Sequence, residues 1–395
     1  MTKVIEKTEH KKGYKKTKLG WIPEDWEVIK LGSIIEESTL KSSVENQLPV
    51  LTSSRRGLMY QTDYYNEQNV IFNKSNIGFN ILPKGYITYR SRSDDGFFTF
   101  NLNKLADGIV SIYYPVFKTK FNDYFICSLL NISSKILYKY AIGSSQKVLA
   151  INDLSKILYA IPKIEEQEKI AEILSAWDDG IETLEKLIEQ KEILKKATMQ
   201  KLFLEKESWK MMRFDKIFKD FCKKNCPRER LLSATQENGV IPRDMLSGKV
   251  MSPEGSLDGY KLIEAGDFVI SLRSFQGGLE YSKYRGILSP AYTVLKNIID
   301  IDKDFYRHFF KSYKFIEKYL SISVIGIRDG KQISYSDLSS VKIPYPPLEE
   351  QEKIGKILNC YDEELQLLNS KLEKLKEQKK GLMQKLLTGQ IRVKV

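Results

Sequence analysis

Histidine is scarce in this chain of 395 residues, and cysteine is nearly as rare. The two His are His10 and His308, and of the four Cys only Cys222 and Cys226 lie close together. No second Cys or His pair completes a zinc site, so no metal ligands are predicted. With four scattered Cys, the chain is expected to be a reduced, cytoplasmic protein.

Catalytic sequence motifs are also missing. The Gly-Lys pairs at Gly248, Gly330 and Gly355 are followed by Val, Gln and Ile, not by the Ser or Thr of a phosphate-binding loop. Pro346 and Pro347 lie in Tyr-Pro-Pro-Leu, which lacks the Asn or Asp with which amino-methyltransferases hold a target amine. We find no strand-borne Gly-x-Gly-x-x-Gly and no nuclease carboxylate cluster. These absences make binding without chemistry the leading class of function.

Long hydrophobic runs are absent too, and none approaches the roughly 18 residues of a membrane-spanning helix, so no membrane partner is predicted. Charge is unbalanced, with 63 Lys and Arg against 51 Asp and Glu, a formal net charge of +12. A basic balance favours a polyanionic partner, nucleic acid before a membrane surface. Lys-rich residues 1–20 precede no apolar segment, so they are predicted to be a solvated basic tail and not a signal peptide.

The chain does contain a close internal repeat. Residues 153–203 and 337–387 align without a gap, 184 positions apart, with 21 of 51 positions identical. Unrelated segments of this length would share about three. The blocks Glu-Glu-Gln-Glu-Lys-Ile and Met-Gln-Lys-Leu recur whole. A repeat of this kind indicates a pseudo-two-fold molecule, which should bind its target at two places.

Both copies of the repeat are predicted to be long helices that begin after Pro162 and Pro347. In the second copy, apolar residues step by alternating four and three, a heptad seam interrupted at Lys379. About 40 residues would extend about 60 Å. Two stripes of equal length in one chain favour antiparallel pairing of the helices over packing of each helix on its own module. The predicted pairing residues are Leu174, Trp177, Ile181, Leu184 and Ile188 in the first helix and Leu358, Tyr361, Leu365, Leu368 and Leu372 in the second.

The segments before the repeats are rich in β-forming residues and Gly or Asn turns. In the first, 70–72, 86–89, 97–100 and 109–117 are predicted strands and 121–140 a helix; the second follows more loosely. The predicted fold class is α/β, with two α/β modules joined by two long helices that form an antiparallel coiled coil. The predicted segments are a tail at 1–20, a first module at 21–150, a first helix at 151–207, a second module at 208–334 and a second helix at 335–395.

Three polar loops recur at matching places in the two modules and are predicted to share one face. Arg and Lys side chains can hydrogen-bond guanine edges, and Asn and Gln can bond adenine, although any single Arg could equally be a solvated surface charge. The DNA-binding candidates in the first module are Ser54, Arg55, Arg56, Arg90, Arg92, Ser93, Gln146 and Lys147. Those in the second are Thr235, Gln236, Arg273, Ser274, Gln276, Arg328, Lys331 and Gln332.

The whole chain resembles a known family at its opening Leu-Gly-Trp-Ile-Pro-Glu-Asp-Trp, at both Pro-x-x-Glu-Glu-Gln-Glu-Lys-Ile helix starts and at the ending Leu-Leu-Thr-Gly-Gln-Ile-Arg-Val. The family is that of type I restriction–modification DNA specificity subunits. The resemblance implies two target recognition domains, each reading half of a split sequence in double-stranded DNA. It also implies docking of two methyltransferase subunits and of restriction/translocase subunits.

The resemblance further implies that this chain has no catalysis of its own and binds no cofactor. S-adenosylmethionine, ATP and Mg²⁺ would belong to the partner subunits. Two alternatives stay open at this point. One is a nuclease or methyltransferase with unrecognised motifs, and the other is a coiled-coil scaffold that does not read DNA.

Overall fold

The chain folds into two compact units, each of which holds one module and part of each long helix. Unit 1 is Met1–Thr183 with Leu372–Val395, and unit 2 is Leu184–Lys371. The sequence instead predicts modules and helices as separate segments. This computed structural model describes residues 12–65, 75–204, 206–246, 256–271, 274–321 and 333–394, so the predicted strand at 70–72 lies outside the described residues.

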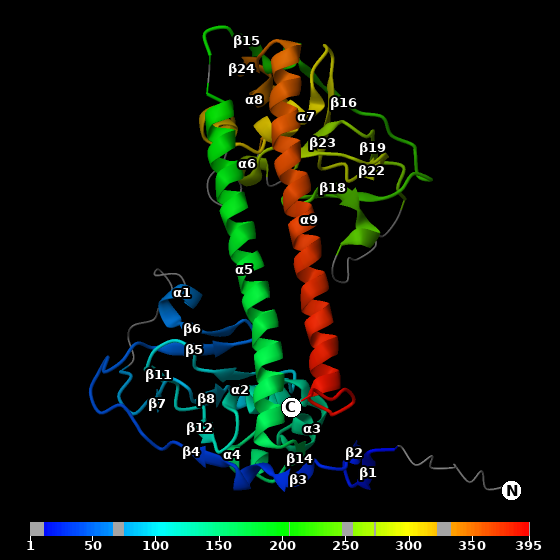
Figure 1. Cartoon of the computed structure of the whole chain (residues 1–395). Coiled ribbons are helices and arrows are strands. Elements are labelled where there is room, and N and C mark those ends of the chain that lie inside the picture. Colours follow the sequence, from blue (N-terminus) through cyan, green and yellow to red (C-terminus); the bar gives the residue numbers. More distant parts are fainter. Residues whose placement is uncertain are drawn as a thin grey trace, which may run out of the picture. The chain divides into compact units, whose positions relative to one another are not determined.

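Two helices of 39 residues each run from one unit into the other, α5 at Ile164–Leu202 and α9 at Leu348–Leu386 (Figure 1). Each begins just after its proline and carries two Glu in the first turn and a Lys in the last, which suits the helix dipole. The side-chain amides of Gln167 and Gln351 donate to the carbonyl of the proline five residues earlier, at 2.9 and 2.8 Å. Both copies of the repeat therefore start their helix in the same way.

Within unit 1, the beginning of α5 packs against the end of α9. Ile170 and Leu174 share one buried cluster with Leu386 and Leu387. Lys379, the polar interruption of the predicted seam, forms an ion pair with Asp178 of α5. The charge on the seam is thus matched by a carboxylate from the facing helix.

Within unit 2, the end of α5 packs against the beginning of α9. Lys191 pairs with Glu364 at 2.7 Å and Lys195 pairs with Asp362, so the helices run antiparallel. Lys195 and Asp362 occupy the repeat positions of Lys379 and Asp178, and the two ion pairs are related by the internal symmetry.

The residues predicted for pairing are buried at Leu174, Leu184, Ile188, Leu358 and Leu372, and half-buried at Trp177, Ile181, Tyr361, Leu365 and Leu368.

Unit 1 holds module 1, which is built of short strands and helices. Its strands are β1 Tyr14–Thr17, β2 Gly20–Pro23, β3 Glu27–Lys30, β4 Ile35–Glu37, β5 Leu51–Ser54, β6 Gly57–Tyr60, β7 Asn80–Leu82, β8 Ile87–Tyr89, β9 Arg92–Ser93, β10 Phe100–Leu102, β11 Gly108–Val110, β12 Val116–Thr119, β13 Lys147–Val148 and β14 Leu158–Ile161. Its helices are η1 Leu31–Ser33, α1 Gln61–Tyr65, α2 Asp123–Ile132, α3 Ser134–Tyr140 and α4 Ile151–Leu154.

Module 1 is centred on a four-stranded antiparallel sheet of order β10-β8-β12-β4. Alternating aromatic residues fill its core, and the rings of Tyr89 and Phe100 stack with centroids 4.6 Å apart. The helix predicted at 121–140 is instead two helices, α2 and α3. The break lies at Ser133, whose hydroxyl donates to the carbonyl of Leu129 at 2.6 Å.

Unit 2 holds module 2, whose strands are β15 Lys210–Arg213, β16 Phe218–Phe221, β17 Leu232–Thr235, β18 Gly239–Pro242, β19 Lys261–Ile263, β20 Phe268–Ile270, β21 Glu280–Tyr281, β22 Gly286–Leu288, β23 Thr293–Asn297 and β24 Lys342–Tyr345. Its helices are η3 Phe214–Lys216, η4 Arg243–Met245, α6 Ser274–Gly277, α7 Lys303–Phe309, η5 Phe315–Leu320 and α8 Tyr335–Ser339. The central sheet has the order β21-β20-β23-β16, which matches module 1 strand for strand. The two modules therefore share one architecture despite their divergent sequences.

Two predicted boundaries differ from the structure. Residues 14–17 of the predicted tail form β1, which pairs with β2, and the Tyr14 hydroxyl donates to the Gly389 carbonyl at 2.8 Å. Each predicted long-helix segment begins instead with a short helix, α4 or α8, followed by a strand, β14 or β24. β14 pairs with β3, and β24 pairs with β15, so each repeat first completes its module before its helix begins.

Candidate nucleic-acid interface

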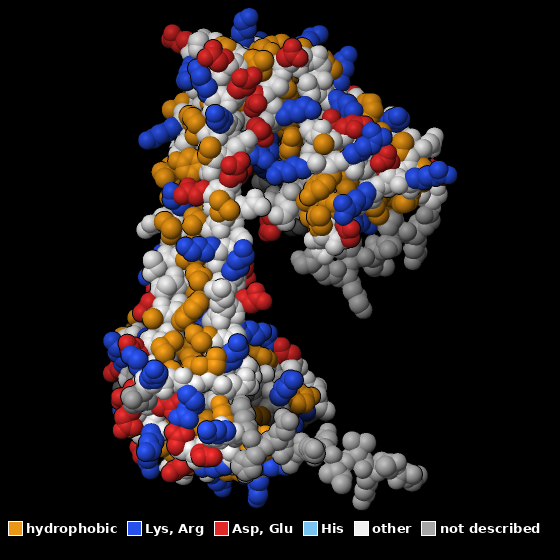
Figure 2. All heavy atoms as spheres, turned by 45° about the vertical axis from the view of Figure 1, so that its right-hand side comes forward, with side chains coloured by type: hydrophobic (Ala, Val, Ile, Leu, Met, Phe, Trp, Pro, Cys, Tyr) orange, Lys and Arg blue, Asp and Glu red, His pale blue; other side chains and the backbone are white. Residues whose placement is uncertain are grey.

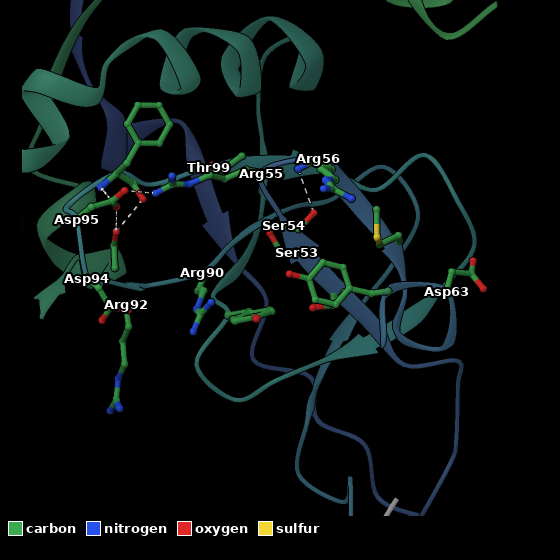
Figure 3. Close-up of a pocket in the computed structure, with 16 residues that line it drawn as sticks. Ser53, Ser54, Arg55, Arg56, Asp63, Arg90, Arg92, Asp94, Asp95 and Thr99 are labelled. Atoms are coloured by element: carbon green, nitrogen blue, oxygen red, sulfur yellow. Dashed lines mark hydrogen bonds and ion pairs between the residues drawn. The ribbon is translucent and has the colours of Figure 1, made fainter. Parts of the chain in front are cut away.

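A hollow of about 1080 Å³ opens on module 1 where the predicted loops meet (Figure 3). We call it the module 1 hollow. The β5–β6 hairpin, the end of β8 and the turn after β9 line it. Six of the eight DNA-binding candidates in this module lie on its wall, namely Ser54, Arg55, Arg56, Arg90, Arg92 and Ser93.

The two serines of this set stabilise turns. The Ser54 hydroxyl donates to the carbonyl of Gly57 at 2.9 Å and accepts from the backbone N–H of Arg56 at 3.1 Å. The Ser93 hydroxyl donates to the Asp95 carboxylate at 2.9 Å. Hydroxyls used in this way fix the loops that carry the longer cationic side chains.

Two of the four arginines at the hollow have local partners. Arg55 pairs with Asp95, and this hydrogen bond lowers the pKa of Asp95 to about 2. The guanidinium of Arg92 lies 4.1 Å from the centroid of the Tyr113 ring. In Figure 3, Arg92 extends away from the Arg55–Asp95 pair.

The other two arginines, Arg56 and Arg90, are exposed. In the part of the chain that the structure describes, neither side chain forms an ion pair or a ring contact. An exposed guanidinium without an internal acceptor can offer all its donors to a phosphate or to a guanine edge. Arg56 and Arg90 are therefore the side chains of this hollow best prepared for an anionic ligand.

The third predicted loop joins the second in module 1. The side-chain amide of Gln146 donates to Asp94 at 2.9 Å, and the Lys147 backbone pairs with Ser93 through β13 and β9. The Lys147 ammonium also lies 4.9 Å from the centroid of the Tyr138 ring. All three loops that the sequence singles out in this module are thus brought together.

Module 2 shows part of the same arrangement. Gln236 and Gln276 are exposed, and the Thr235 hydroxyl donates to the Gly239 carbonyl at 3.0 Å across the hairpin tip. Ser274 departs from the prediction because it is 1% exposed and its hydroxyl accepts from the backbone N–H of Ser271 at 2.8 Å. It holds the start of α6 and does not face solvent. The other predicted residues, Arg273, Arg328, Lys331 and Gln332, lie outside the described residues.

Sequence reasoning missed three polar residues beneath the loops, Asn101, Glu280 and Lys311. Glu280 is 1% exposed and pairs with Lys311 at 2.7 Å. Burial raises the pKa of Glu280, and the nearby Lys311 ammonium opposes that rise. No local sequence pattern marks Asn101 or Glu280, because each alternates along its strand with residues that pack in the main core, such as Phe100 and Tyr281.

A second hollow, of about 480 Å³, lies in unit 2 between module 2 and α9, and residues including Arg307, Asn359 and Asp362 line it. Beside it, the His308 ring nitrogen Nε2 lies 2.9 Å from Asn359 Oδ1. Burial lowers the pKa of His308 to about 4, so the ring is neutral near pH 7.

Among the described residues, no group of three or more His, Cys, Asp or Glu is arranged to hold a metal ion, and no helix is long and apolar enough to cross a membrane.

Comparison with known proteins identifies the modules. A family model described as the type I restriction modification DNA specificity domain matches the chain twice, at residues 23–193 and 206–377. The chain belongs to this family. Each match covers one module and most of the helix that follows it. The family is a non-catalytic one, whose members provide DNA recognition in restriction–modification systems.

Relatives of known sequence and structure agree with this assignment. The chain is 28% identical over 428 residues to the MjaX type I restriction enzyme specificity subunit of Methanocaldococcus jannaschii, covering 96% of this chain and 97% of that protein. It resembles the S subunit of a type I restriction–modification system from M. genitalium with a TM-score of 0.56 at 18% identity, covering 91% of this chain and 96% of that chain. A chain from a study of complex assembly in the type I R-M system gives a TM-score of 0.57 at 15% identity, covering 94% and 99%. These structural likenesses concern the fold.

Proposed function

We propose that module 1 reads one half of a bipartite DNA target and module 2 reads the other. The observation that carries this proposal is the repetition of one architecture with different loop residues, since two copies of a fold with unlike surfaces suit two unlike sequences. On the face drawn in Figure 2, Lys and Arg side chains are spread among Asp and Glu over both modules. The loops, more than the net charge of +12, therefore mark the interface.

The proposed contacts in module 1 come from the hollow described above. Arg56 and Arg90 would meet DNA first, and Arg55 could exchange Asp95 for a base edge or phosphate at little cost, because both side chains of that pair are more than half exposed. In module 2, Gln236 and Gln276 would bond adenine edges. Serine and threonine hydroxyls in both modules support the loops.

Two methyltransferase subunits are proposed to dock on the helices, one in each unit. Two copies of one partner require two like surfaces, so docking residues should be exposed and identical in both copies of the repeat. Buried identities such as Ile170 and Ile354 follow from the shared fold. Exposed charges at the helix ends, such as Glu165 and Lys201, suit the helix dipole.

Five exposed identities remain without such an explanation. They are the pairs Glu168 and Glu352, Lys169 and Lys353, Glu189 and Glu373, Lys196 and Lys380, and Gln200 and Gln384. Since surface positions usually tolerate substitution, identity at these places favours a shared binding role. One member of each pair lies in unit 1 and the other in unit 2.

The partner subunits are proposed to supply the chemistry. We assign S-adenosylmethionine to the methyltransferase subunits, and ATP and Mg²⁺ to restriction/translocase subunits that join the complex. The whole assembly would act in the cytoplasm. The purified chain alone, given all three cofactors, should neither methylate nor cleave DNA, and turnover by rigorously pure protein would overturn the proposal.

Native mass spectrometry of the assembled complex tests the docking surfaces. Glu168→Lys should remove one of two methyltransferase subunits, and Glu168→Lys with Glu352→Lys should remove both. Glu192→Lys is the matched control, because Glu192 is exposed on α5 and the other repeat already has Lys376 at that place. Loss of both subunits from the single variant, or of neither from the double variant, would reject these residues as docking sites.

A further inference from the structure

Asn101 and Glu280 occupy the same place in the two modules. Asn101 on β10 lies opposite Thr88 of the central strand β8, and Glu280 on β21 lies opposite Val269 of the central strand β20. Both side chains are buried, with 9% and 1% of their surface exposed. A buried polar side chain needs a hydrogen-bond partner. In both modules, hydrogen bonds connect this side chain to the equivalent hairpin, β5–β6 in module 1 and, through Lys311, β17–β18 in module 2.

In module 1, Asn101 holds the recognition hairpin directly. Its amide donates to the Ser53 hydroxyl at 2.7 Å and to the Ser54 carbonyl at 3.1 Å. These are the last two residues of β5, and Arg55 and Arg56 follow at once. The Asn101 amide therefore ties the tip that carries two candidate DNA contacts to the central sheet.

In module 2, Glu280 holds the corresponding hairpin through a lysine. The Lys311 ammonium donates to the Glu280 carboxylate at 2.7 Å, to the Gln236 carbonyl at 3.3 Å and to the Gly277 carbonyl at 3.0 Å. Gln236 belongs to the hairpin tip and Gly277 ends α6, so one cation joins two of the predicted loops.

The hairpin backbone in module 2 also lies directly on the strand that carries Glu280. A Cβ at Gly239 would come within 2.6 Å of the Tyr281 carbonyl oxygen, and Gly239 has a φ of +68°. The hairpin therefore packs against the same edge strand in both modules. The residues that hold it there differ chemically, Asn101 in module 1 and the Lys311–Glu280 pair in module 2. Among the described residues, the second oxygen of Glu280, Oε2, is buried with no hydrogen-bond partner, so the polar contact of this carboxylate there is the ion pair to Lys311.

We propose that Asn101 and the Lys311–Glu280 pair are positioning residues that set the geometry of base recognition, each in its own module. This inference rests on the proposed function. Bidentate contacts to base edges require side chains held within about 0.5 Å of their working position. Anchoring the loop backbone, at the Ser54 and Gln236 carbonyls, supplies that precision without touching DNA.

The test uses the assembled methyltransferase complex and DNA duplexes that carry its methylated motif, with single-base changes in one half or the other. Asn101→Leu should reduce discrimination against changes in one half by roughly tenfold or more, with the other half unaffected. Lys311→Met should do the same for the opposite half. Lys314→Met is the matched control, because Lys314 lies three residues further on and donates to the Phe203 carbonyl at 2.8 Å, away from the hairpin.

A double variant guards against simple misfolding. Lys311→Met with Glu280→Leu replaces the pair by apolar side chains, which is often neutral for stability, and should still lose discrimination in the same half. Equal slowing on all duplexes with unchanged discrimination would mean a merely structural role and would overturn the inference. Uniform weakening with a smaller salt dependence would make Lys311 a phosphate contact and would overturn it too. A wild-type complex that methylates no bipartite motif would instead defeat the proposed function.

Discussion

Arg392, near the end of the chain, binds Asp25 and the first turn of α5 within unit 1, and removing it should loosen that unit. Its guanidinium donates to Glu166 at 2.7 and 2.8 Å and to Asp25 at 2.8 and 2.6 Å. The indole N–H of Trp26 donates to the same Glu166 carboxylate at 3.0 Å. Arg392→Met would leave that carboxylate buried beside a single donor.

The size of the effect follows from burial. The side chain of Glu166 is 3% exposed and that of Arg392 is 36% exposed. Breaking a fully buried ion pair costs about 3–5 kcal/mol, whereas exposed pairs contribute less than about 1 kcal/mol. For a pair with one buried and one partly exposed member, we expect a loss of about 2 kcal/mol. This loss corresponds to roughly 30-fold faster hydrogen exchange of the backbone amides that become exposed when β3 separates from its neighbours.

Unit 2 provides a matched comparison at the same repeat position. Lys206 pairs there with Glu350, and the Trp209 indole donates to Glu350 at 2.8 Å. The side chains of Lys206 and Glu350 are 56% and 24% exposed, so Lys206→Met should cost less than about 1 kcal/mol. Hydrogen exchange measured by mass spectrometry resolves the two units separately.

One further variant decides whether this reasoning is right. Arg392→Met with Glu166→Gln should recover part of the loss, because no unpaired carboxylate stays buried and the amide oxygen still accepts from Trp26. Equal losses for Arg392→Met and Lys206→Met, or no recovery in the double variant, would refute the argument from burial.

The Arg392 contact also predicts a pH dependence. Its hydrogen bond lowers the pKa of Asp25 below the ordinary value. The stabilisation is therefore present above about pH 4 and is lost as pH falls through the lower folded-state pKa. Arg392→Met should lack this acid-sensitive contribution, and exchange measured across that pH range should show a shallower slope than in the wild type.

Inserting one heptad near Glu189 and one near Glu373 lengthens α5 and α9 equally by about 10 Å, so the spacer in the methylated motif should grow by about three base pairs. An unchanged spacer would show that helix length does not set it. Arg92→Ala should weaken binding by about 1–3 kcal/mol at one base if Arg92 reads guanine, or uniformly with a salt slope smaller by about one if it contacts phosphate. Competition binding at several salt concentrations separates the two, and no change excludes Arg92 from the interface. Because the pKa of His308 is lowered to about 4, its contribution to the stability of unit 2 should be present above about pH 6.5 and be lost as pH falls toward 4. His308→Gln should flatten that dependence, and identical exchange profiles would contradict it.

The sequence predicts the features that arise from local periodicity. The heptad spacing marks Leu174 and Leu358, both buried, and the prolines mark the helix starts at Ile164 and Leu348. Loop composition likewise marks cations such as Arg90, which the structure places on the wall of the module 1 hollow. Each of these signals lies within a few residues of the feature that it predicts.

What the sequence does not predict depends on partners far away in the chain. Glu166 looks like any first-turn glutamate, and its bonds to Trp26 and Arg392 span 140 and 226 positions. The strand β14 lies inside a segment predicted as helix because its pairing partner β3 is remote. No local sequence pattern around Asn101 predicts its hydrogen bond to Ser53, 48 positions away. Such contacts require the folded topology.

Methylome sequencing tests the central claim most directly, namely that each module reads its own half of the target. A host carrying the complete system would be compared with one in which residues 21–150 are replaced by those of a relative. We expect a two-part methylated motif with an unspecified spacer, in which the replacement changes one half and leaves the other half and the spacer as they were. A single undivided motif, or a change in both halves after replacement of module 1 alone, would contradict the account.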